Sequence, residues 1–143
     1  MIQKLRHFQS LNDVVLFFHI IGLWCCLPCI LLFPLERVLR FLTPEKTDSS
    51  DPGSSTRRRQ KIMLFANYWF SRRYVAKYNT CLKRSLVLYY FLTRSGVPIR
   101  FCIGVRREES DENLSGHSWI EEHDEQLYDN EFVRIYVYPP SFW

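Results

Sequence analysis

Two stretches of the chain each lack charges of one sign. Residues 57–84 contain nine Lys or Arg and no Asp or Glu, whereas residues 108–131 contain ten Asp or Glu and no Lys or Arg. The net charge of +4 therefore hides two oppositely charged segments, and we expect them to form two faces of opposite sign.

A disulfide framework is also missing. The chain has five cysteines, an odd number, and Cys25, Cys26 and Cys29 lie in a hydrophobic run. This pattern favours a reducing compartment, so we expect a cytoplasmic protein. With 143 residues, of which 47% are hydrophobic, the chain is long and apolar enough for about one globular domain.

Residues 14–33 lack Asp, Glu, Lys and Arg altogether. By length this run could span a bilayer, but no small-residue cleavage site follows it, which argues against a secretory signal. We prefer two helices that pack on the core or on a partner, with Pro28 or Pro34 starting the second. The apolar side of that second helix would consist of Leu35, Val38, Leu39 and Leu42.

Composition divides the chain into three segments within one structural domain. Residues 1–42 form a hydrophobic helical segment. Residues 43–56 are rich in Ser and Pro and are predicted to be a flexible linker or loop. Residues 57–143 carry the motifs described below, and within them residues 61–78 mix apolar and basic side chains as an amphipathic helix does. No internal repeat is present.

A buried helix is predicted to begin at Cys81. Apolar and aromatic residues recur after it at helical spacing, and Gly96 can end the helix in a left-handed turn. Asn79 or Thr80 is a natural N-cap. Cys81 would then lie in the first turn, where free amides and the helix dipole favour a thiolate.

Three strands are predicted after this helix, at residues 98–105, 116–120 and 126–138. An acidic loop joins the first two. If residues 121–125 form a hairpin loop, His117 lies directly across from Asp129. Directly opposed side chains have Cβ atoms about 5 Å apart, which suits a hydrogen bond between imidazole and carboxylate.

A thiol, an imidazole and a carboxylate in this order indicate nucleophilic catalysis. The Cys81 thiolate would attack a carbonyl, His117 would take and return the proton, and Asp129 would fix the imidazole tautomer. The Cys81 amide is the first candidate to stabilise an oxyanion, and Asn79 is a second.

The other reactive or ionisable side chains are expected to have structural roles. Cys102 is predicted to be an inert strand thiol, and Glu121 a surface charge. The predicted hairpin tip holds His123 and Asp124. The hydrophobic run could offer metal ligands, but its apolar setting supplies no second shell, so we expect core packing for His19, Cys25, Cys26 and Cys29.

Three motifs stand in sequence: Cys-Leu-Lys-Arg-Ser-Leu-Val-Leu-Tyr-Tyr-Phe-Leu (81–92), Ser-Gly-Val-Pro-Ile-Arg-Phe-Cys-Ile-Gly-Val-Arg (95–106) and Gly-His-Ser-Trp-Ile-Glu (116–121). Together they resemble the transglutaminase-like leader peptidases of lasso peptide biosynthesis, over roughly residues 60–132. The chain departs from that family at Gly116 and Ser118, where alanines are common, and at residues 122–125, where a turn ending in Gly is more usual.

The resemblance implies an α+β, papain-related fold, with the nucleophile at the start of a buried helix packed on an antiparallel sheet and hydrophobic helices before it. It implies a cysteine endopeptidase with Cys81 as nucleophile, His117 as general base and acid, and Asp129 as orienting residue. The substrate would be a ribosomally made precursor peptide, cut between leader and core without a metal or other cofactor.

Partners follow from the same resemblance. Some family members carry a fused leader-recognition domain, which the first 56 residues here do not resemble, so a separate leader-recognition protein is expected. An ATP-dependent cyclase would then use the released core. Independently of the resemblance, the apolar run at residues 14–33 leaves membrane contact as the alternative to a purely cytoplasmic location.

Three other functions stay open at this point. A non-hydrolytic module of the same fold could hold the precursor or its partners at a membrane. Acyl transfer to an amine would share the acyl-enzyme chemistry. The basic residues 57–84 with interleaved aromatics could bind nucleic acid, but aromatics at helical spacing are more often core, and we expect no nucleic-acid partner.

Overall fold

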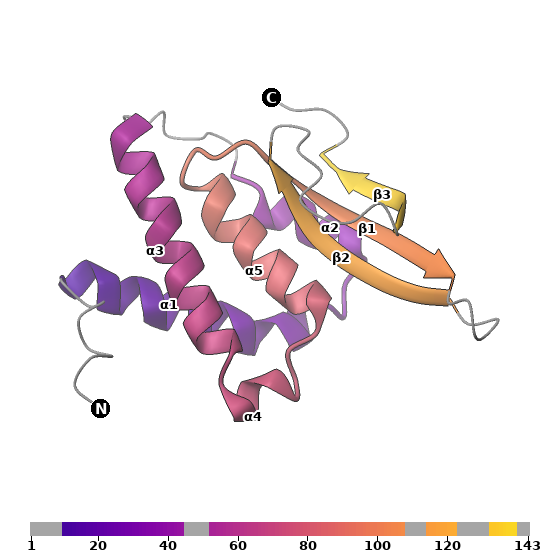
Figure 1. Ribbon diagram of the computed structural model, residues 1–143, viewed down its shortest axis with the longest axis horizontal. Coiled ribbons are helices and arrows are strands. Elements are labelled where there is room, and N and C mark those ends of the chain that lie inside the picture. The colour runs from indigo at the N-terminus through magenta and orange to yellow at the C-terminus, as the bar shows by residue number, and fades with distance from the viewer. Residues whose placement is uncertain (1–9, 45–51, 108–113, 123–131, 140–143) are drawn as a thin grey trace.

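The computed structural model describes residues 10–44, 52–107, 114–122 and 132–139. Within these ranges five helices precede three strands, and this order, which can be followed in Figure 1, confirms the expected α+β class. In chain order the elements are α1 (Leu11–Ile30), α2 (Leu35–Leu42), α3 (Pro52–Phe70), α4 (Arg73–Ala76), α5 (Cys81–Thr93), β1 (Ile99–Arg107), β2 (Leu114–Glu122) and β3 (Val133–Tyr138).

Helix α5 is the centre of the fold. It packs against β1 and β2 on one side and against α1 and α3 on the other. Its Leu86 and Tyr89 are fully buried, together with Phe65 of α3 and Phe101 of β1. The Tyr89 ring lies edge-on to that of Phe101, with 6.3 Å between centroids. One core therefore joins the sheet to the helices.

Helix α5 begins and ends where the sequence predicted. The Thr80 side chain accepts a hydrogen bond from the Lys83 amide at 3.3 Å, so Thr80 is the N-cap. Gly96 has a φ of 75°, and the Val97 amide donates to the Leu92 carbonyl at 3.2 Å. This is the left-handed helix end that glycine permits. Cys81 is thus the first residue of the helix.

The sheet is antiparallel with the strand order β2-β1-β3. The sequence predicted instead that residues 126–138 pair with the strand that carries His117. This is wrong for β3, which pairs with β1. Phe101 and Cys102 of β1 are both buried, as expected for a central strand with neighbours at both edges. The predicted pairing is based on the length of a loop, which does not show which strand is central.

The N-terminal helices belong to the same core. Ile20 and Leu27 of α1 are buried, as are Val38, Leu39 and Leu42 of α2. In Figure 1, α1 crosses beneath α3 and α5. The helix runs through Pro28 to Ile30, so Pro34 and not Pro28 precedes the second helix. The amphipathic second helix predicted from the sequence is confirmed.

Two expectations about the N-terminal half are wrong. The expected core packing is not found, because α1 buries only a narrow stripe: the residues concerned are all exposed, namely His19, Cys25, Cys26 and Cys29. The predicted linker at residues 43–56 is too long, because α3 already begins at Pro52. Proline suits the first turn of a helix, where its missing N–H is not needed.

Candidate active site

Cys81 stands in a positively charged setting at the start of α5. Its thiol is free and partly exposed. The first turn of the helix contains no acidic residue and carries Lys83 and Arg84. The amide of Cys81 lies at a position where backbone N–H groups have no partner inside the helix. A nucleophile here is close to the positive end of the helix dipole.

His117 lies on β2, partly buried beside two aromatic rings. The imidazole stacks on Trp119 with 6.1 Å between centroids, and lies 5.2 Å from the Phe132 ring. Burial lowers the pKa of His117 below its ordinary value of 6.5. The imidazole is therefore neutral at pH 7 and able to accept a proton.

A hydrogen bond fixes α5 against β2 close to both residues. The Ser85 hydroxyl donates to the Ser118 carbonyl at 2.9 Å, and both residues are buried. Ser85 lies one helical turn after Cys81, and Ser118 directly follows His117. The bond therefore holds the N-terminal half of α5 beside the part of β2 that carries His117.

A cavity of about 180 Å³ lies along the same junction, and Arg84, Ser85 and His117 are among its lining residues. Cys81 is one turn beyond Ser85, outside this lining. Side chains alternate along a strand, so His117 shares a face of β2 with Trp119 and not with Ser118, which faces α5. The His117 side chain therefore lies on the opposite face of β2 from the one that packs on α5.

Glu121 is buried on the same face of the sheet as His117, contrary to the prediction of a surface charge. Its side chain is 1% exposed. One carboxylate oxygen accepts from Trp119 Nε1 at 2.8 Å and the other from Arg134 at 3.0 Å. The signal that sequence reasoning missed is the spacing of His117, Trp119 and Glu121, which puts all three on one face.

Gly104 explains how Trp119 fits beneath His117. Gly104 and His117 are directly paired across β1 and β2. A Cβ on Gly104 would lie 2.7 Å from the Trp119 ring and 2.9 Å from the Val133 carbonyl oxygen. Only glycine lets the indole lie this close to β1, and the indole in turn supports the imidazole.

Cys102 is buried on the same face and is not a nucleophile. Burial, followed by the charge of Glu121, raises the pKa of its thiol to about 12. The thiol stays protonated throughout the neutral range, so it cannot compete with Cys81. This agrees with the prediction of an inert strand thiol.

Alkylation of the native protein by iodoacetamide at pH 8 is expected to modify Cys81 and to spare Cys102, because the thiolate is the reacting species. The exposed Cys25, Cys26 and Cys29 are internal positive controls. Peptide mapping by mass spectrometry identifies each modified cysteine. In urea Cys102 should react as well, and its rapid modification in the folded protein would contradict the buried position.

Of the remaining candidate residues, some lie outside the described ranges and Asn79 lies inside them. Asp129, His123 and Asp124 lie outside the described residues. Within the described ranges no group of His, Cys, Asp and Glu is arranged to hold a metal ion. The Asn79 side-chain oxygen is buried without a hydrogen-bond partner in this part of the chain, and its side-chain NH2 group is the part that could donate to an oxyanion. The Cys81 amide is the stronger candidate donor, because backbone N–H groups at a helix start have no partner inside the helix.

One comparison with known proteins found a match. A family model described as "Transglutaminase-like superfamily" matches residues 29–136, more than half of the chain, from the end of α1 into β3. Neither a curated protein nor a solved structure matches the sequence. With a cysteine at the start of a buried helix and a histidine on the adjoining antiparallel sheet, the chain belongs to the transglutaminase-like superfamily.

Proposed function

We propose that this protein is a cysteine endopeptidase that removes the leader from a ribosomally synthesised lasso precursor peptide. The observation that carries the proposal is Cys81 at the N-terminus of α5, held beside the His117 strand by the bond between Ser85 and Ser118. The superfamily includes cysteine peptidases. The resemblance of residues 81–92, 95–106 and 116–121 to lasso leader peptidases supports the choice of substrate.

The proposed reaction has two halves. The Cys81 sulfur bonds to the scissile carbonyl carbon while His117 takes the thiol proton, and the C–N bond then breaks as His117 gives that proton to the leaving amine. Water, deprotonated by His117, then attacks the thioester carbonyl. The C–S bond breaks, the leader leaves as a carboxylic acid, and His117 returns the proton to the Cys81 thiolate. Asp129 would hold the imidazole in the required tautomer.

The proposed partners are a separate leader-recognition protein and an ATP-dependent cyclase. The amine released in the first half-reaction is the group that such a cyclase would join to an Asp or Glu side chain of the core. The basic side chains near Cys81, among them Lys83 and Arg84, are suited to an acidic leader or an acidic surface of the partner.

Mass spectrometry of a precursor peptide encoded beside this protein tests the proposal. The peptide is incubated with the protein, with and without the neighbouring leader-binding protein. Cleavage at one bond, stimulated by the partner, is the expected result. An intact peptide would favour the non-hydrolytic scaffold instead, and a product joined to an amine would indicate acyl transfer.

The pH dependence of cleavage is expected to follow His117. Because its pKa is lowered, kcat/KM should rise with pH through an apparent pKa below 6.5 and should then stay level through pH 7. Steady-state rates between pH 4.5 and 8.5 measure this. A rise centred near pH 8 would instead indicate that ionisation of the thiol limits the rate and that His117 is not the base.

A further inference from the structure

Helix α1 presents an apolar face to the surface along its whole length. Its buried residues are Asp13, Ile20 and Leu27, whereas Phe18 is 64% exposed. The exposed side chains recur at helical spacing and continue past the end of the helix: Leu11, Val15, Phe18, Cys25, Cys29, Leu32 and Phe33. Such a face is larger than the isolated apolar residues of an ordinary surface.

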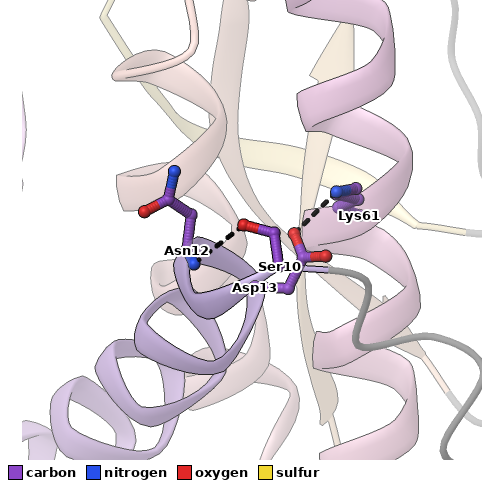
Figure 2. A network of polar contacts seen from close by, with 4 residues as sticks. All are labelled: Ser10, Asn12, Asp13 and Lys61. Carbon is purple, nitrogen blue, oxygen red and sulfur yellow. Dashed lines mark hydrogen bonds and ion pairs between the residues drawn. The ribbon is translucent and has the colours of Figure 1, made fainter.

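By length and composition α1 could cross a bilayer. Its contacts argue against that. The buried Asp13 carboxylate accepts a hydrogen bond from Lys61 Nζ of α3 at 2.6 Å (Figure 2). A spanning α1 would leave Ile20 and Leu27 without the core and would carry an unpaired Asp13 towards hydrocarbon, which is costly.

Positive charge borders the exposed face. A groove of about 590 Å³ runs beside the N-terminal half of α1, where Arg58 and Arg94 lie alongside Val15, Phe18 and His19. Further along the helix the Lys83 ammonium lies 5.5 Å from the centre of the Trp24 ring. An apolar strip with cations at its border matches the interface of a membrane that contains anionic lipids.

We propose that α1 lies in the plane of an anionic membrane surface, with its outer face inserted at the boundary between headgroups and acyl chains. An interfacial helix normally needs a polar side of its own. Here α3 and α5 cover the inner side of α1, which explains why a helix that lacks a continuous polar side can lie on a membrane without spanning it. This proposal does not depend on the peptidase activity.

A lipid surface fits α1 better than a protein partner does. Interfaces between proteins combine an apolar centre with a polar rim and about one hydrogen bond per 100–200 Å². Residues 14–33 contain no Asp, Glu, Lys or Arg, and the cations lie beside the helix and not on its outer face. Insertion into lipid needs no hydrogen-bond partner on that face.

Sedimentation with vesicles tests the proposal on the full chain. Binding to vesicles of phosphatidylcholine with 30% phosphatidylglycerol, a probe composition chosen for charge, should exceed binding to phosphatidylcholine alone by at least about tenfold at low salt. Phe18→Asp should lower the bound fraction by about tenfold or more. Ile135→Asp on β3 is the matched control, since Ile135 is 62% exposed, and should bind like the wild type.

Three results would overturn the proposal. Equal binding of the Phe18→Asp and wild-type proteins to the vesicles would show that α1 does not lie at the membrane interface. Retention in the vesicles after washing at pH 11 would show a spanning helix. A wild-type dimer that Phe18→Asp converts to a monomer, without vesicle binding by either, would show that a second copy covers this face. Circular dichroism confirms that both variants are folded.

Discussion

Alanine in place of Cys81 is expected to lower the rate of precursor cleavage by roughly 10⁴-fold or more, because no other group can form the acyl-enzyme. The change removes only a partly exposed sulfur atom from the first turn of α5, so the fold should be retained. Single-turnover cleavage, followed by mass spectrometry, measures the loss.

Cys29→Ala is the matched control for this experiment. Cys29 is an exposed thiol on α1, and its loss should leave the cleavage rate in solution unchanged. If the Cys81→Ala protein kept most of its activity while its melting curve matched that of the wild type, the proposed mechanism would be wrong. A loss of activity in both variants would indicate that the loss comes from a disturbed fold and not from the missing catalytic thiol.

The Glu121→Ala variant is expected to be less stable than the wild type by about 2–4 kcal/mol. The change leaves the buried Trp119 N–H without its acceptor at 2.8 Å and deprives Arg134 of its partner at 3.0 Å. Because Arg134 is itself partly exposed, water compensates some of its loss, so the cost stays below that of a fully buried ion pair. Urea unfolding followed by tryptophan fluorescence measures the difference.

The neighbouring residue gives a close control. Glu122 pairs with Arg59 near the surface, and such pairs contribute about 0–1 kcal/mol. Glu122→Ala should therefore change the unfolding free energy by less than about 1 kcal/mol. Equal losses of unfolding free energy in the two variants would mean that the buried Glu121 contributes no more to stability than a surface carboxylate does.

Local signals in the sequence were sufficient for the elements that position the nucleophile. The spacing of apolar residues after Cys81, the Thr80 cap and Gly96 all act within a few residues, and each appears in the structure as predicted. The strand that carries His117 was predicted at residues 116–120, and these residues lie within β2. Its pairing with Asp129 stays a prediction, because Asp129 is outside the described residues.

The predictions that were wrong concern contacts between segments that are distant in the sequence. The position of β1 between β2 and β3 depends on which strand is buried on both faces, and loop length does not encode this. Glu121 is buried because Arg134 approaches from β3, a contact between strands that are not neighbours. The cysteines of α1 are exposed because α3 and α5 cover only one side of an apolar helix.

The sharing of one core between α1 and α5 has a consequence for biosynthesis. Ile20 emerges from the ribosome well before Leu86, with which it shares the core. At a synthesis rate of about 5–20 residues per second, the nascent α1 waits several seconds for the helix that covers its inner side. During that interval both sides of an almost wholly apolar helix are unprotected. We therefore expect production of the chain to rely on a chaperone or a nearby bilayer that shelters α1 until α5 has been made.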